Sequence, residues 1–303
     1  MAKFSVAEAA FSGVRLLARR PLPALVWGLV YVVFLAVIVT PFAGDLFAFF
    51  SAVSKMNGAP NPDALLPLLA PVAGFYFLFI VGALVVVSVI SCAVYRAELR
   101  PEESGFAYLR LGSEELWVLL VNFVQALVMI GAQIAMAIPV GIVVALISMG
   151  NLASAAVISR VGQAVVDVVA IWLYLRFSLA GPMTFADRRF RLFDSWVLTR
   201  GLGWRLLGVG AIIGALALAV YMLVLIVGLA AGMSLWTTMP HPANPAALLS
   251  LPPQEWASEL APILVLGGVL TTLAGTLLIP IFIAPWAHIY RHLQGSGVAA
   301  TFS

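Results

Sequence analysis

The sequence predicts an all-α, polytopic membrane helix bundle with six transmembrane helices, and three observations support this fold class. The 303-residue chain is 63% hydrophobic and 10% charged, with a mean hydropathy of +1.09, whereas soluble domains carry about 25% charged residues. It contains six apolar runs of about 20 residues or more, the length that spans the hydrocarbon core of a bilayer. Its basic residues gather in alternate segments between these runs. We therefore expect lipid to cover much of the surface.

The six apolar runs define one integral membrane domain over residues 1–303. They are Leu22–Ala43, Leu66–Val94, Leu116–Ile147, Ala156–Ala180, Leu206–Gly232 and Leu260–Trp286. The second, third and sixth runs are longer than a perpendicular span requires, which predicts tilted or kinked helices. Pro139, Pro280 and Pro285 are the expected kink sites. The first run is long enough to span, and we expect it to be retained rather than cleaved as a signal peptide.

Lysine and arginine are distributed asymmetrically across the predicted spans. All but two of the 16 basic residues fall in residues 1–21, 95–115, 176–205 and the C-terminal tail. The exceptions are Lys55 and Arg160. Basic connecting segments remain in the cytoplasm, so we expect both termini there, with 44–65 and 233–260 outside. Six spans bring the chain back to its starting side. The sequence thus predicts a multi-pass protein of a bacterial inner membrane.

Short amphipathic helices are expected in the basic segments, and Thr184–Thr199 has the clearest pattern. Its apolar residues share one helical face; they are Phe185, Leu192, Phe193, Trp196 and Val197. Such a helix places its aromatic face at the acyl boundary and its arginines among anionic headgroups. The candidate headgroup ligands are Arg188, Arg189 and Arg191. The alternative is a helix that packs on the protein's own cytoplasmic surface.

Polar side chains inside the third and fourth spans form a candidate intramembrane cluster. Its members are Asn122, Gln125, Gln133, Arg160, Gln163 and Asp167. Polar residues in spanning helices ordinarily hydrogen-bond to neighbouring helices; the functional alternative is a hydrated cavity or relay. Counting residues from the cytoplasmic ends places Gln125 level with Asp167 in an antiparallel pair. We therefore expect Asp167 to contact Gln125 and Gln163 inside the bundle.

Motifs for catalysis or cofactor binding are absent from the sequence. There is one cysteine, Cys92, which excludes an intrachain disulfide, and the histidine, serine and phosphate-binding signatures of common enzyme families are missing. His288 and His292 have the i,i+4 spacing that can share a metal, but no carboxylate lies near them in sequence. We therefore expect no enzyme activity, no metal, no cofactor and no nucleic-acid partner.

An internal repeat is suggested by the order of the segments. Three times a short basic or mixed segment precedes two spans that end in an arginine: Arg96 in VYRAEL, Arg176 in LYLRFS and Arg291 in HIYRHL. Two spans per unit preserve orientation, so these would be three parallel two-helix repeats. Chance agreement among common interfacial residues is the alternative.

Two cytoplasmic stretches carry a resemblance to known proteins. VYRAELRPEESGFAYLRLGSEELW and LAGPMTFADRRFRLFDSWVLTRGLGWRLLG resemble an uncharacterised group of six-helix membrane proteins from Alphaproteobacteria. That group is distantly similar to the membrane domain attached to some glycerophosphoryl diester phosphodiesterases. The resemblance implies a membrane module and transfers no active-site residue, because the chain has no room for a soluble catalytic barrel.

Two functions follow as hypotheses. The first is a non-enzymatic membrane protein that organises lipid or protein partners, including a second copy of itself, through its cytoplasmic amphipathic helices. The second is a transporter or permease component with a polar site between the third and fourth helices. Broken helices at matching places in each repeat would favour transport, and Pro139 and Pro280 do not occupy matching places.

Overall fold

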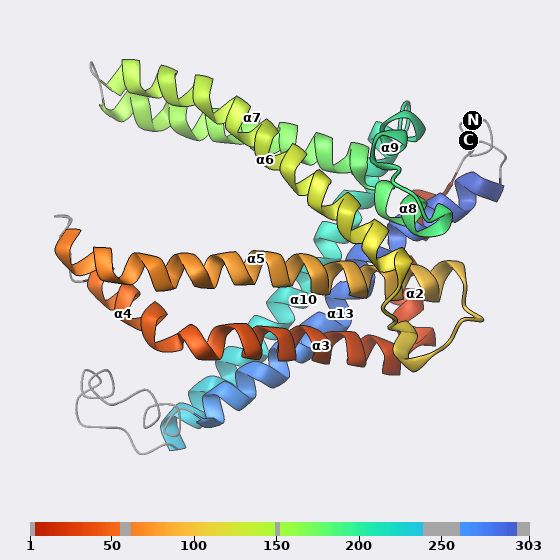
Figure 1. Ribbon diagram of the computed structural model, residues 1–303, viewed down its shortest axis with the longest axis horizontal. Helices are drawn as coiled ribbons and strands as arrows, with labels where there is room; N and C mark the ends of the chain where they lie inside the picture. The colour runs from red at the N-terminus through yellow and green to blue at the C-terminus, as the bar shows by residue number, and fades with distance from the viewer. Residues whose placement is uncertain (1–3, 55–61, 149–151, 239–260, 296–303) are drawn as a thin grey trace. The chain divides into compact units, whose positions relative to one another are not determined.

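Six long apolar helices dominate the computed structural model, which describes residues 4–54, 62–148, 152–238 and 261–295 (Figure 1). Each is long and apolar enough to cross a membrane, and no strand occurs among the described residues. The prediction of an all-α, six-span bundle is therefore confirmed. The spans are built from α3 (Pro21–Val39) with η1 (Thr40–Phe42) and α4 (Ala43–Ser54), α5 (Pro62–Leu99), α6 (Ser113–Ser148), α7 (Leu152–Phe177), α10 (Gly203–Thr238) and α13 (Ala261–Gly295).

Short helices lie in the segments between spans. They are α1 (Val6–Ala10), α2 (Ser12–Arg19), η2 (Phe106–Tyr108), α8 (Ala180–Asp187) and α9 (Leu192–Leu198). The expectation of one helix over Thr184–Thr199 is wrong. The helix stops at Arg188, whose left-handed backbone (φ 53°) turns the chain before α9 begins. The amphipathic pattern is therefore divided between two helices.

The described chain divides into two compact units. The first comprises the described residues of Met1–Leu16, Ser88–Gly214 and Ile281–Ser303. Its core joins the end of α5, the start of α6, α8 and the end of α13, through the buried residues Cys92, Tyr95, Val118, Phe185 and Ala287. A second core joins Val121 of α6, Phe177 of α7, Ala180 of α8 and Leu192 of α9. Because α8 is buried almost throughout, it is part of this core.

The second unit comprises the described residues of Leu17–Val87 and Ala215–Pro280. In it α3 crosses α13 closely at Gly28, where an added Cβ would lie 2.6 Å from the Thr272 carbonyl oxygen and 2.6 Å from the Thr276 hydroxyl. Small residues allow such backbone approach in membranes. On α5, Phe79 packs against Phe34 of α3 with ring centroids 5.9 Å apart. In this unit, α3 thus contacts α13 through Gly28 and α5 through the packed rings of Phe34 and Phe79.

The lipid-facing character of the spans is clearest on α6. Ile130, Ile134, Ile138 and Ile142 follow one another at every fourth position and are each more than half exposed. Helices α6 and α7 lie side by side as an antiparallel pair (Figure 1). Pro139, one of the expected kink sites, lies within α6, which continues through it as one helix. Most of the predicted outer loop 233–260, with its prolines and His241, lies outside the described residues.

The order of the elements is compatible with the predicted repeat. Short helices α1 and α2 precede the first two spans, η2 precedes α6 and α7, and α8 and α9 precede α10 and α13. The order of elements repeats three times, but order alone does not show that the three pairs of spans have the same structure. The threefold repeat therefore stays a prediction.

Candidate functional site

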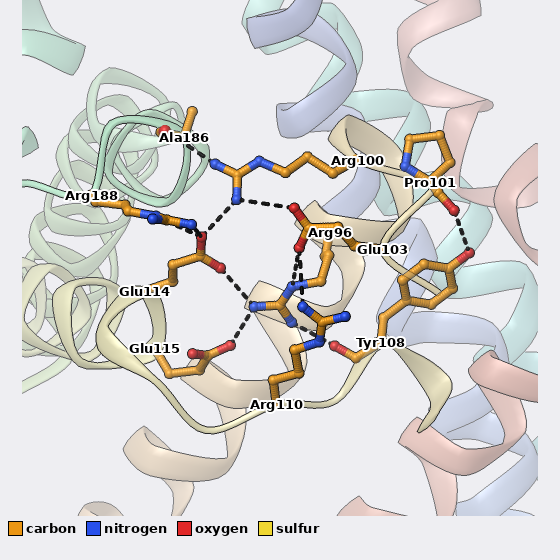
Figure 2. Close-up of polar contacts among 10 residues, drawn as sticks. All are labelled: Arg96, Arg100, Pro101, Glu103, Tyr108, Arg110, Glu114, Glu115, Ala186 and Arg188. Carbon is orange, nitrogen blue, oxygen red and sulfur yellow. Dashed lines mark hydrogen bonds and ion pairs between the residues drawn. The ribbon is translucent and has the colours of Figure 1, made fainter. Parts of the chain in front are cut away.

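The densest polar network in the described chain lies where α5 ends and α6 begins (Figure 2). We call it the Arg96 cluster, and its charged members are Arg96, Arg100, Glu103, Arg110, Glu114, Glu115 and Arg188. Arg96 is in the last turn of α5, and Glu114 and Glu115 are in the first turn of α6. A cation at a helix C-terminus and anions at a helix N-terminus are both stabilised by the helix dipoles.

Arg96 is the centre of the cluster and is only 1% exposed. Its Nη2 donates to Glu114 Oε2 at 2.8 Å and to Glu115 Oε1 at 2.7 Å, and its Nη1 donates to the Tyr108 carbonyl oxygen at 2.6 Å. These contacts tie the end of α5 to η2 and to the start of α6. Arg96 therefore fixes the turn between the second and third spans.

Glu114 connects this turn to α8. Its Oε1 accepts hydrogen bonds from Arg100 Nη1 at 2.6 Å and from Arg188 Nε at 2.9 Å. The Arg96 and Arg100 guanidinium groups lie 5.3 and 5.0 Å from the centroid of the buried Phe185 ring of α8, within the range of cation–π attraction. The cluster thus joins the turn between α5 and α6 to α8, which lies far away in the sequence.

The arrangement of the Arg96 cluster is suited to holding structure. Each of its three carboxylates is within ion-pair distance of at least one arginine. Buried charges require such pairing and hydrogen bonding to be tolerated. No nucleophile paired with a general base is among its members. We assign the cluster to positioning the connecting segments.

The three arginines predicted to bind headgroups are not equivalent. Arg188 pairs with Glu114 at 2.8 Å, although its side chain is 60% exposed. Arg191 is buried between Asp187 and Asp194. Burial alone would lower the pKa of Arg191, but its hydrogen bonds to the two carboxylates raise that pKa above its usual value. Arg189 is exposed and makes no ion pair among the described residues, so it alone has a free guanidinium.

Arg176 connects the end of α7 to α9. Its Nη1 donates to the Thr199 carbonyl at 3.0 Å, and its own carbonyl accepts from the Ser195 hydroxyl at 2.8 Å. Its guanidinium lies over the rings of Trp172 and Trp196, at 5.3 and 5.5 Å from their centroids. Arg176 and Arg96, matching positions of the predicted repeat, thus both bind the segment that follows their span.

The intramembrane polar residues do not form the single cluster that we expected. Gln163 Nε2 donates to Asp167 Oδ1 at 2.9 Å, and Asn122 Nδ2 donates to Ser88 Oγ of α5 at 2.9 Å. No hydrogen bond among the described residues joins Gln125 to Asp167. The side chains of Gln133, Arg160, Gln163 and Asp167 are exposed, and Gln125 is partly buried. The expectation that Asp167 is buried against Gln125 is therefore wrong.

Two features explain the difference: the direction in which Asp167 projects from α7, and the register in which α7 pairs with α6. The buried residues Ala155 and Val166, with Gly162 packed on Val140 of α6, mark the face of α7 that meets its neighbour. Asp167 follows Val166 by one residue and is turned by about 100° around the helix. Its depth also differs from the prediction: Val140 lies opposite Gly162 and Val121 packs with Phe177, so Gln125 is level with the C-terminal end of α7 and not with Asp167.

A third polar group lies at the end of α13, and sequence spacing revealed only part of it. His288 Nε2 and His292 Nε2 are 3.1 Å apart, and His288 Nδ1 is 3.0 Å from Glu98 Oε1 of α5. Glu8 of α1 completes a set of three side chains whose possible ligand atoms lie within 4.8 Å of one another. Both carboxylates are supplied by segments remote in sequence, which no local motif could indicate.

Comparison of the chain with protein-family models, curated proteins and solved structures gives no match. The described residues form a polytopic, all-α helix bundle with six helices long and apolar enough to cross a membrane. The resemblance of its basic stretches to the membrane domain of glycerophosphoryl diester phosphodiesterases stays a prediction.

Proposed function

We propose that this protein is a non-enzymatic inner-membrane protein of a bacterium that organises anionic lipid around its cytoplasmic face. Both termini and the segments 95–115 and 176–205 are cytoplasmic in this proposal. The observation that carries it is a stretch of chain in which exposed aromatic side chains alternate with exposed arginines that make no ion pair among the described residues. We call this stretch the interfacial surface, and its members are Arg189, Phe193, Arg200 and Trp204.

The interfacial surface combines two chemistries that suit the membrane boundary. Phe193 is 60% exposed and Trp204 is 86% exposed, and indole rings are favoured at the headgroup level. Arg189 and Arg200 are also exposed and make no ion pair among the described residues. Each basic residue near an anionic surface contributes about 1 kcal/mol to binding. The two arginines would therefore attract acidic headgroups beside the aromatic anchors.

The Arg96 cluster supports this proposal by fixing the surface in place. Arg188 forms an ion pair with Glu114 of α6, and Arg191 forms ion pairs with Asp187 of α8 and Asp194 of α9. These contacts hold α8 and α9 in place within the first unit. The exposed residues of α9 and the start of α10 are then presented from a fixed frame. This revises the predicted headgroup ligands from Arg188, Arg189 and Arg191 to Arg189 and Arg200.

The test is lipid selectivity of the full-length protein in vesicles. Spin-labelled phosphatidylglycerol and phosphatidylcholine are added separately, and the motionally restricted fraction of each is measured. We expect a higher fraction for phosphatidylglycerol, and we expect the double variant Arg189→Gln/Arg200→Gln to reduce that excess. Added salt should reduce it in the wild-type protein as well.

A matched control removes two positive charges from the predicted opposite side, as Lys55→Gln/Arg160→Gln. The excess of restricted phosphatidylglycerol should remain larger in this control than in Arg189→Gln/Arg200→Gln. Equal effects of the two double variants would contradict a role for this particular surface. Equal restriction of both lipids by the wild-type protein would contradict the proposed function itself.

The transporter hypothesis keeps one supporting observation. Asp167 and Gln163 are exposed along the middle of α7, where an ionised carboxylate facing hydrocarbon costs at least about 2.5–3.5 kcal/mol. Such a residue usually faces a polar path or another helix. No hydrogen bond among the described residues joins Asp167 to Gln125, so the polar site between the third and fourth helices has less support, and we place transport second.

A further inference from the structure

We propose that His288, His292 and Glu8 bind one divalent transition-metal ion of the zinc type, with Glu98 positioning His288. This inference contradicts our expectation of a metal-free protein and is independent of lipid selectivity. All four residues belong to the first compact unit. They come from α13, α1 and the end of α5.

The positions of the candidate ligand atoms fit a tetrahedral ion. Zinc binds imidazole nitrogen and carboxylate oxygen at about 2.0–2.2 Å, so its tetrahedral ligands are separated from one another by about 3.3 Å. The two Nε2 atoms are 3.1 Å apart. Since the Glu8 carboxylate lies within 4.8 Å of both, a small rotamer change closes the set.

Glu98 prepares His288 to be a ligand. Its Oε1 lies 3.0 Å from His288 Nδ1, so the neutral imidazole donates its Nδ1 proton to Glu98 and keeps a lone pair on Nε2. That lone pair faces His292. A carboxylate that fixes the tautomer of a ligating histidine in this way is a recurring feature of metal sites. His288 is buried, with 6% exposure, which holds the ring in position.

The nearest cation, Arg291, lies on the other side of the imidazole. Its Nη2 is 3.0 Å from Glu98 Oε1 and its Nη1 donates to the Glu98 carbonyl at 2.9 Å. Its charge is thus directed at Glu98 and at the Nδ1 edge of His288, away from Nε2. With neutral imidazoles, the charges of Glu8 and Glu98 balance those of Arg291 and of Arg15, whose Nη2 donates to the Glu8 carbonyl at 2.5 Å, so the ligand set rather than an excess of negative charge carries the proposal.

Local contacts also set the position of Glu8. Ser5 caps α1 by accepting from the Glu8 amide at 3.3 Å, and Arg15 Nη2 donates to the Glu8 carbonyl at 2.5 Å. These bonds leave the carboxylate free. His292 and Glu8 are both exposed, so three protein ligands leave a fourth position open to water or to an external ligand. The ion would join α1 to the end of α13.

The experiment uses the full-length protein in detergent, purified through a tag that contains no histidine. Zn²⁺ affinity and stoichiometry are measured by competition with a chromophoric chelator, and Co²⁺ is used to record visible ligand-field bands. We expect one ion per chain and a tetrahedral Co²⁺ spectrum. His292→Ala should lower Zn²⁺ affinity at least about 100-fold, and Glu98→Gln should lower it about 10–100-fold.

His241→Ala is the matched control, because it removes the remaining histidine of the chain and should leave affinity unchanged. Glu8→Gln should weaken binding without changing the melting temperature of the metal-free protein. Zn²⁺ should raise the melting temperature of the wild-type protein and of His241→Ala, but not that of His292→Ala. Failure of the wild-type protein to take up Zn²⁺, or equal losses in His292→Ala and His241→Ala, would overturn the proposal.

Discussion

Replacement of Arg96 by methionine tests whether the Arg96 cluster holds the first unit together. Methionine keeps an unbranched apolar stem and removes the guanidinium. Glu115, whose side chain is 6% exposed, then loses the one ion pair it makes among the described residues, and Tyr108 loses the donor to its carbonyl. Breaking a buried ion pair from one side costs about 3–5 kcal/mol, so we expect Arg96→Met to lower the free energy of unfolding by that amount.

Arg110→Met is the matched control for that variant. Arg110 makes one exposed ion pair, 3.4 Å from Glu103, with its own side chain 49% exposed. Exposed pairs contribute about 0–1 kcal/mol, so this variant should be close to the wild type. Both are measured by reversible unfolding in mixed micelles titrated with dodecyl sulfate and followed by tryptophan fluorescence.

A second substitution separates the lost pair from the lost packing. In Arg96→Met/Glu115→Gln the buried charge left by the first change is neutralised, so part of the stability should return, by about 1–3 kcal/mol. If Arg96→Met/Glu115→Gln is as unstable as Arg96→Met, lost packing rather than the unpaired charge of Glu115 accounts for the destabilisation. A loss below about 1 kcal/mol for Arg96→Met would refute the idea that the cluster fixes the turn between α5 and α6.

Three further predictions concern topology and packing. With the native cysteine replaced by alanine, a membrane-impermeant maleimide added to intact cells should label Ser250→Cys and not Ser104→Cys; the reverse pattern would refute the orientation. Gly28→Ala should lower the free energy of unfolding by about 1–3 kcal/mol because its Cβ would meet α13, whereas Gly267→Ala, which has open space around it, should not; equal effects would refute close contact. Asp167→Leu should lower stability in detergent by no more than about 0.2–0.5 kcal/mol, the value of the one i,i+4 side-chain pair that it breaks, and a much larger loss would show a buried polar contact.

The spans were predictable because hydropathy acts locally. Each apolar run has to satisfy its backbone hydrogen bonds internally within the membrane, so composition alone dictates a helix. The structure extends the predicted second span, Leu66–Val94, to Pro62–Leu99. The added residues at the C-terminal end include Arg96, whose charge is paired with Glu114 and Glu115.

The division between α8 and α9 was not predictable from the pattern. No glycine or proline interrupts residues 184–199, and the apolar residues keep helical spacing through the break. The left-handed turn at Arg188 is accompanied by contacts remote in sequence, in which Glu114 binds the side chain of Arg188 and the first unit buries Phe185. Tertiary packing here overrides local propensity.

The sites differ from prediction for a related reason. Spacing along one helix correctly brings His288 to His292 and Gln163 to Asp167. Contacts between helices also depend on the register of the two helices, which pairs Val140 with Gly162, and on the face that each helix turns toward its neighbour; counting residues in a single sequence establishes neither. Glu8 and Glu98 lie close to His288 although they are far from it in the sequence, so a search for carboxylates near His288 in the sequence could not find them.

The basic segments illustrate how one set of arginines has two separable effects. Orientation during insertion depends on Lys and Arg, and acidic residues contribute little to it. After folding, Arg96 and Arg191 are bound by carboxylates and Arg189 is left free. The same count that predicts topology therefore overestimates the charge available to lipid. Of the arginines in the segment 176–205, Arg189 and Arg200 are exposed and make no ion pair among the described residues, so the proposed attraction of lipid by this segment depends on these two, which precede Phe193 of α9 and Trp204 of α10 in the sequence.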